Sequence, residues 1–195
     1  MNKPEYVRID SKKYKINTDF RIAIECDKIA RNSDIGVYEK ALAIIYKLFG
    51  DEGLNATEDY ELLLELGQKY LACGKELEDS NEEPDMDFEE DMDYIEASFM
   101  SDYKIDLKES NMHWWTFFNL VNGLSNSELG NCCVLNRIRN LRNCDVSKIK
   151  DRKEREKITK AQEQVALKKN KKENKLTKEQ EESMRRFNEK ILRRE

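Results

Sequence analysis

The chain has 195 residues, 38% of them hydrophobic and 38% charged, which is enough apolar material for one modest domain with a solvated extension and excludes two large domains. It contains no run of roughly 18 apolar residues, and charges occupy the place of a signal peptide's apolar core, so we expect a protein that stays in the cytoplasm. The net charge of −5 is divided unevenly along the chain. Residues 148–195 carry 18 Lys and Arg against 10 Asp and Glu, a balance of +8, whereas residues 1–147 carry 17 against 30, a balance of −13. This asymmetry suits contact with an oppositely charged partner or with the chain's own body.

A β-hairpin is predicted close to the N-terminus. Apolar and polar side chains alternate on each side of a polar link at residues 10–12, which is the pattern of two paired strands with one buried face. The apolar positions of this pattern are Val7, Ile9, Tyr14 and Ile16. Because an isolated hairpin is marginally stable in water, we expect it to lie against helices or to extend another sheet.

Three helices are predicted between the hairpin and residue 75, because apolar residues recur at spacings of three and four. Their apolar positions are Ile22, Cys26 and Ile29, then Val37, Ala41, Ile44, Ile45 and Leu48, and then Leu63, Leu66, Tyr70 and Cys73. Asn17 or Thr18 is expected to cap the first helix, and Gly50 to end the second. Thr57 and the acidic residues after it are expected to begin the third helix, which Gly74 ends.

An acidic loop is predicted at residues 76–92. Carboxylates are frequent there, lysine and arginine are absent, and Pro84 interrupts the chain. A helix is expected to resume near Asp91, because apolar residues then recur on one side, at Met92, Ile95 and Phe99.

The most aromatic part of the chain is predicted to be a helix at residues 112–121, capped by Ser110 or Asn111 and stopped by Gly123. Its bulky residues cannot all face one way, because neighbours on a helix diverge by about 100°: they are Trp114, Trp115, Phe117 and Phe118. This helix is therefore either the buried centre of the fold or, in part, a partner-binding face with aromatic anchors. We name Trp114 and Trp115 as candidate partner-binding residues.

The C-terminal third is predicted to be helical and increasingly charged. A helix should start at Ser125 or Ser127 and bury one face, formed by Val134, Ile138 and Leu141. Beyond it, two thin apolar stripes suit contact with a partner but cannot build a core alone, and we name their members as candidate binding residues: Ile158, Ala161 and Val165, and then Met184, Phe187 and Ile191 after a capping box at residues 177–180.

The elements together predict a mainly α fold. We expect a compact helical body with a small N-terminal β-hairpin at residues 1–150, followed by a charged, amphipathic helical extension at residues 151–195. Only two prolines occur in the chain, and none lies beyond residue 84, so helix is open to the whole second half.

No constellation of residues indicates catalysis. The acidic run at residues 85–93 offers oxygen ligands but lacks the glycine and the ligand register of a calcium-binding loop, so a solvated loop is the simpler interpretation, with a metal-dependent enzyme as the alternative. The single histidine, His113, has no nucleophile motif beside it and is interpreted as a packing or capping residue. The five cysteines form no C-x-x-C pair and are interpreted as buried thiols. We expect no cofactor and no enzyme activity.

The basic C-terminal region has three interpretations. It is a solvated charged helix, a surface that docks on a protein partner, or a surface that binds the phosphates of nucleic acid together with Arg137, Arg139 and Arg142. The sequence pI of about 5.3 argues against nucleic acid. No membrane contact is expected.

Several segments of the chain resemble one family. They are Asp-Phe-Glu-Glu-Asp at residues 87–91, Tyr-Ile-Glu-Ala-Ser-Phe at 94–99, Asp-Tyr-Lys-Ile-Asp-Leu at 102–107, Met-His-Trp-Trp-Thr-Phe at 112–117, Asn-Gly-Leu at 122–124, and the stretch at 139–150 that ends in Asp-Val-Ser-Lys-Ile-Lys. Together they resemble the phage gene product fifteen family of siphophages and prophages of low-GC Gram-positive bacteria. The likeness covers about residues 35–167 and is strongest at 87–151.

The resemblance implies a function in protein binding. Members of this family are similar in gene position and size to tail-assembly chaperones, which are encoded between the major tail protein and the tape-measure protein. The chain is therefore expected to bind the tape-measure protein and tail subunits in the cytoplasm of the bacterial host, with homo-oligomer formation left open. A nucleic-acid-binding phage accessory protein is the alternative. The resemblance carries over no catalytic residue, and Trp114 and Trp115 carry over as signature positions only.

Overall fold

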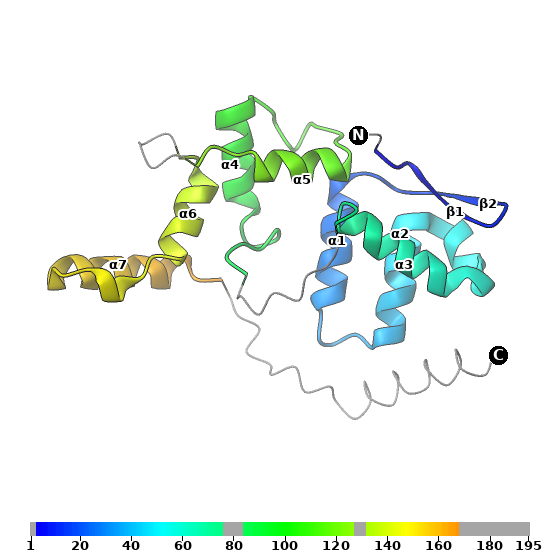
Figure 1. Cartoon of the computed structure of the whole chain (residues 1–195), viewed down its shortest axis with the longest axis horizontal. Helices are drawn as coiled ribbons and strands as arrows, with labels where there is room; N and C mark the ends of the chain where they lie inside the picture. Colours follow the sequence, from blue (N-terminus) through cyan, green and yellow to red (C-terminus); the bar gives the residue numbers. More distant parts are fainter. Residues whose placement is uncertain (1–2, 76–83, 127–131, 168–195) are drawn as a thin grey trace. The chain divides into compact units, whose positions relative to one another are not determined.

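The computed structural model describes residues 3–75, 84–126 and 132–167, which belong to two compact units (Figure 1). The described part of unit 1 consists of residues 3–75 and 112–117, and that of unit 2 consists of 84–111, 118–126 and 132–167. The described residues form seven α-helices and one two-stranded hairpin, so the predicted mainly α fold is confirmed. The predicted division at residue 150 stays a prediction.

Unit 1 consists of a hairpin and three helices, completed by the first turn of α5. Its elements are β1 (Tyr6–Ile9), β2 (Lys12–Lys15), α1 (Phe20–Arg31), α2 (Val37–Asn55), the 3-10 helix η1 (Thr57–Asp59), α3 (Tyr60–Leu71) and the start of α5 (Trp114–Asn122). The strands pair antiparallel with Tyr6 opposite Lys15, which confirms the predicted hairpin. Asp10 adopts a φ of 51° in the turn, a conformation that Asp tolerates better than most residues.

The hairpin is attached to η1 through one carboxylate. Asp59 Oδ2 accepts hydrogen bonds from Lys12 Nζ at 3.0 Å and from Tyr14 Oη at 2.6 Å. The apolar side of the hairpin is buried as well, because Ile9 and Tyr14 are only 5% and 3% exposed. A hairpin that would be marginal in isolation is therefore held by burial on one side and by the ion pair at its end.

The cap of α1 differs from the prediction. Asp19 caps the helix, since its Oδ1 accepts a hydrogen bond from Arg21 N at 2.9 Å. The predicted caps, Asn17 and Thr18, have backbone groups engaged elsewhere: Asn17 N donates to Leu48 O, and Thr18 O accepts from Trp114 N, each at 2.7 Å. These tertiary bonds fix the two residues in the segment before the helix.

Glycines shape the packing of α2 against α3. Gly50 has φ 64° and ψ −156°, which breaks the regular helix where the sequence predicted its end, although helical turns resume and continue to Asn55. Gly67 on α3 lies against α2, where an added Cβ would be 3.0 Å from Leu48 Cδ1. The absence of a side chain at Gly67 lets Leu48 become fully buried between the two helices.

Unit 2 contains the remaining helices. They are α4 (Met92–Tyr103), the rest of α5, α6 (Val134–Arg142), the 3-10 helix η2 (Val146–Lys148) and α7 (Arg152–Val165). Ile95 and Phe99 of α4 and Leu135 of α6 are fully buried and form the centre of its core. Residues 84–91, which lead into α4, form bends and turns, and residues 76–83 of the predicted acidic loop lie outside the described residues.

The start and the buried face of α6 differ from the prediction. The helix begins at Val134, and Cys133 caps it through a hydrogen bond from Asn136 N to its Sγ at 3.4 Å. Ser125 is therefore not its cap, and Ser127 lies outside the described residues. Leu135 and Asn136 form the buried face, whereas the predicted positions, Val134, Ile138 and Leu141, are half-buried. The shift follows from Leu135 N, which donates to Ser98 Oγ of α4 at 3.0 Å.

None of the described helices combines the length and the apolar composition that crossing a bilayer requires.

The attachment of the hairpin should depend on pH. Hydrogen bonds from Tyr14 and Lys12 lower the pKa of Asp59 below its usual value of 3.8, so the folded state favours the ionised carboxyl. Its contribution to the free energy of unfolding is fully present above pH 3.8 and is lost as the pH falls through the lowered pKa. We expect Asp59→Asn to be less stable than the wild-type chain at neutral pH, with the difference vanishing in acid. Denaturant unfolding at a series of pH values measures this, with Asp51→Asn as an exposed control. A difference that persists unchanged in acid would contradict the assignment.

Candidate functional site

His113 begins α5. Its Nδ1 accepts a hydrogen bond from Trp115 N at 3.1 Å, so Nε2 carries the ring hydrogen and donates to the carbonyl of Pro4 at 3.2 Å. The predicted capping role of His113 is confirmed, whereas the predicted caps Ser110 and Asn111 are wrong. The reason is a backbone bridge between Asp19 and His113, which keeps the chain extended up to the start of the helix.

The two tryptophans cap the C-terminus of a different helix. Trp114 Nε1 donates to Leu71 O and Trp115 Nε1 donates to Tyr70 O, each at 2.9 Å. These carbonyls belong to the last turn of α3, where helical carbonyls have no partner within their own helix. Two adjacent residues of one helix thus satisfy two adjacent carbonyls at the end of another.

The aromatic rings pack into one cluster in unit 1. Phe20 stacks on Phe117 with ring centroids 4.5 Å apart, and Trp114 lies 5.8 Å from Phe117. Trp114 is 4% exposed and Phe117 is fully buried, while Trp115 is half-buried against Tyr70 at 6.2 Å. Of the two interpretations of the aromatic helix, burial applies to Trp114. The assignment of Trp114 and Trp115 as partner-binding residues stays a prediction.

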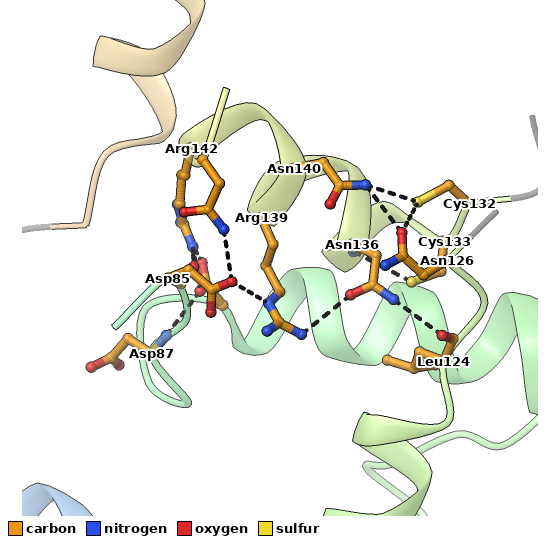
Figure 2. A network of polar contacts seen from close by, with 12 residues as sticks. Asp85, Asp87, Leu124, Asn126, Cys132, Cys133, Asn136, Arg139, Asn140 and Arg142 are labelled. Carbon is orange, nitrogen blue, oxygen red and sulfur yellow. Dashed lines mark hydrogen bonds and ion pairs between the residues drawn. The ribbon is translucent and has the colours of Figure 1, made fainter. Parts of the chain in front are cut away.

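A second cluster, which consists of polar side chains on and around α6, connects segments of unit 2 (Figure 2), and we call it the α6 network. At its centre Arg142 Nη1 and Nη2 donate to Asp91 Oδ2 and Oδ1, each at 2.7 Å. The Asp91 side chain is 1% exposed and that of Arg142 is 11% exposed. Hydrogen bonding from Arg142 to Asp91 raises the pKa of the guanidinium, which stays charged. The two residues form a bidentate, buried ion pair.

Arg142 also holds two further segments. Its Nη1 donates to the carbonyl of Asp85 at 2.9 Å, and its Nε donates to the carbonyl of Val165 at 2.7 Å. One side chain at the end of α6 therefore joins the acidic segment before α4 to the last residue of α7.

The rest of the α6 network extends this link in both directions. Asp85 Oδ2 accepts from Arg139 Nε at 3.1 Å and from Asn143 Nδ2 at 3.0 Å. Asn136, which is 6% exposed, donates from Nδ2 to the carbonyl of Leu124 at 3.1 Å. Figure 2 shows these side chains reaching from α6 to the segments on either side of it. We define the α6 network as Asp85, Asp91, Asn136, Arg139, Arg142 and Asn143.

Sequence reasoning did not predict the α6 network, although a signal was present. An acidic run without any lysine or arginine needs cations from elsewhere in the chain if part of it is buried. Arg139 and Arg142 are one helical turn apart and therefore lie on the same side of α6.

The first predicted apolar stripe lies on α7. Ile158, Ala161 and Val165 are half-buried, and Gln162 beside them donates from Nε2 to the carbonyls of Cys144 at 2.8 Å and Leu141 at 2.9 Å. The stripe thus faces the rest of unit 2 in part, while the remaining sides of α7 are exposed and charged. The second stripe, Met184, Phe187 and Ile191, lies outside the described residues.

The described residues include no group of three or more His, Cys, Asp or Glu side chains placed to hold a metal ion. All five cysteines are free, of which Cys26 and Cys133 are buried and the other three are half-buried. Burial raises the pKa of the Cys26 thiol to about 12 and that of Cys73 to about 11, so both thiols stay protonated and are poor nucleophiles at neutral pH.

The arginines of the nucleic-acid alternative are largely engaged. Arg142 and Arg139 pair with Asp91 and Asp85, so their charges are directed into unit 2. Of the three arginines predicted for phosphate contact, Arg137 alone is exposed.

The comparisons with known proteins give one result. A family model described as "Bacteriophage Gp15 protein" matches residues 2–167, which is most of the chain. Searches of curated proteins and of solved structures find no match.

Breaking the buried ion pair should destabilise unit 2 strongly. We expect Asp91→Asn or Arg142→Met to lower the free energy of unfolding by about 3–5 kcal/mol, because each leaves its partner buried and charged or unpaired. Arg137→Met, an exposed control on the same helix, should change it by less than about 0.5 kcal/mol. Denaturant unfolding followed by circular dichroism measures the change. Equal effects of Arg142→Met and Arg137→Met would contradict the assignment.

The two tryptophan caps should differ in strength. Replacing either indole by phenylalanine removes one hydrogen bond to α3 and should cost about 1–3 kcal/mol where the carbonyl is left without water. Trp114→Phe should therefore destabilise unit 1 more than Trp115→Phe, because Tyr70 O, the partner of Trp115, keeps a second hydrogen bond from Cys73 N at 3.0 Å. Hydrogen exchange of the amides at the end of α3 measures both losses. If Trp115→Phe is the more destabilising variant, lost side-chain packing, and not the lost hydrogen bond, accounts for the destabilisation.

Proposed function

The chain belongs to the Bacteriophage Gp15 protein family, as the resemblance of its motifs predicted, and we propose that this phage protein is a tail-assembly chaperone. In this role it binds the tape-measure protein and tail subunits in the host cytoplasm while the tail is built. It acts by binding other polypeptide chains and catalyses no reaction. The gene product fifteen resemblance supplies this function, and family membership alone supports only the coarser statement that it is a phage protein.

The single observation that supports the proposal best is the half-buried apolar stripe of α7. Its apolar stripe, Ile158, Ala161 and Val165, is half-buried, and Gln162 and Arg142 connect the helix to the rest of unit 2 through backbone carbonyls. A helix with a narrow apolar stripe and exposed, charged sides suits recognition of another helix, in which an apolar stripe enters a groove and charges set the register. The tape-measure protein implied by the resemblance is a long helical client of this kind.

The site chemistry fits a binding protein better than the alternatives. The carboxylates of the acidic segment serve as partners of Arg139, Arg142 and backbone amides, which supports a structural role for them. The same ion pairs withdraw two arginines from phosphate contact, which disfavours nucleic acid as the partner. We therefore place the binding surface on α7, with the second stripe at Met184, Phe187 and Ile191 as its predicted continuation.

Co-expression with the tape-measure protein tests the proposal. We expect the chain to increase the soluble fraction of that protein and to co-purify with it. Ile158→Ser combined with Val165→Ser should weaken the complex about tenfold or more, because each change removes apolar area from the contact. Thr159→Ser combined with Gln164→Ser, at exposed positions of the same helix, is the matched control.

Circular dichroism of each variant verifies that α7 stays folded, so a loss of binding can be separated from a loss of structure. If the solubility of the tape-measure protein is the same with and without this chain, the chaperone function is wrong.

A further inference from the structure

Unit 1 presents a row of carboxylates on the exposed side of α3. Glu58 of η1 and Glu61 and Glu65 of α3 are all exposed and follow one another at spacings of three and four residues. Such spacings place side chains on one face of a helix. The opposite face of α3, with Leu63 and Tyr70, is buried. We call Glu58, Glu61 and Glu65 the acidic row.

Unit 2 presents a matching row of lysines on α7. Lys153, Lys157 and Lys160 are exposed and follow one another at spacings of four and three residues. At about 100° per residue, these lysines span about 60° of the circumference of α7, beside the half-buried stripe, since Lys157 precedes Ala161 by one turn. We call Lys153, Lys157 and Lys160 the basic row. No member of either row forms an ion pair with another residue in the part of the chain that the structure describes.

The two rows are complementary in charge and in spacing. Read in opposite directions, the spacing of four and three in the basic row equals that of the acidic row, so an antiparallel pair of helices brings all three opposite charges together in one register. The neighbouring charge at Glu156 does not oppose this, because it is already paired with Arg152 at 2.9 Å. At the edge of the acidic row, Leu62 is 48% exposed and gives the contact an apolar element.

We propose that α7 of one copy of the chain docks antiparallel on α3 of a second copy, with the basic row opposite the acidic row. Each chain carries both surfaces, so the contact is heterologous and copies join head to tail. The inference concerns self-association and does not depend on the tape-measure protein. Opposite charges arranged in one register also increase the rate of encounter and exclude other registers, in which like charges would meet.

Sedimentation equilibrium of the full chain tests this proposal. We expect concentration-dependent self-association at about 0.05 M salt that weakens strongly at about 0.5 M, because the rows are exposed and screened by ions. A first variant reverses the acidic row with Glu61→Lys and Glu65→Lys, and a second reverses the basic row with Lys153→Glu and Lys157→Glu. Each should raise the dissociation constant about tenfold or more.

Two combinations separate a specific contact from an effect of net charge. A chain that carries all four reversals, and an equimolar mixture of the two variants, should both regain association, because opposite charges again face one another. Glu5→Lys combined with Glu39→Lys changes the net charge of the chain as much as the first variant does, at exposed positions outside the row, and should leave association unchanged.

The proposal is overturned if the wild-type chain stays monomeric at low salt, as it would if α7 contacted only its own chain. It is also overturned if the fourfold variant, shown to be folded by circular dichroism, fails to regain association. Neither result bears on binding of the tape-measure protein, which is measured separately.

Discussion

Buried helix ends leave backbone groups without partners, and in both units the structure satisfies them with side chains from distant segments. In unit 1 the indoles of Trp114 and Trp115 bond to the last carbonyls of α3. In unit 2 Ser98 bonds to an amide in the first turn of α6, and Gln162 bonds to carbonyls at and beyond its other end. The placement of these helices therefore depends on specific polar contacts as much as on burial of apolar side chains.

The ion pair of Asp91 with Arg142 extends the same principle to charges. A carboxylate that is 1% exposed persists as a charge only when a cation and further donors surround it, and Arg142 supplies both bonds of a bidentate pair. Because Arg142 also bonds to the carbonyls of Asp85 and Val165, the charge that neutralises Asp91 fixes the ends of two other segments. The geometry of the Asp91–Arg142 ion pair therefore positions the acidic segment, α6 and α7 within unit 2.

The sequence predicted those elements that local periodicity encodes. The hairpin, α1, α2, α3 and α4 follow from alternation or from helical spacing. The buried residues of α2 are largely those predicted, whereas α1 buries Phe20 and Ala23 beside the predicted Cys26, and Ile22 and Ile29 are half-buried. Most errors lie at helix ends, and one concerns the buried face of α6. Asn17 and Thr18 do not cap α1, because their backbone groups bond to Leu48 and Trp114, and α6 starts where Ser98 of another helix provides an acceptor. The pair of Asp91 with Arg142 joins residues 51 positions apart. No local pattern specifies such a contact, although the lack of cations in the acidic run indicated that one was needed.

Several residues of the segments that carry the family resemblance bond within the structure. His113, Trp114 and Trp115 hold helix ends in unit 1, and the acidic segment holds α6 in unit 2. Because these side chains bond within their own unit, we propose that partners are recognised by the outer sides of helices such as α3 and α7, which are exposed and of opposite charge. On such surfaces the free energy of each ion pair is small, and specificity comes from the register in which several charges meet at once.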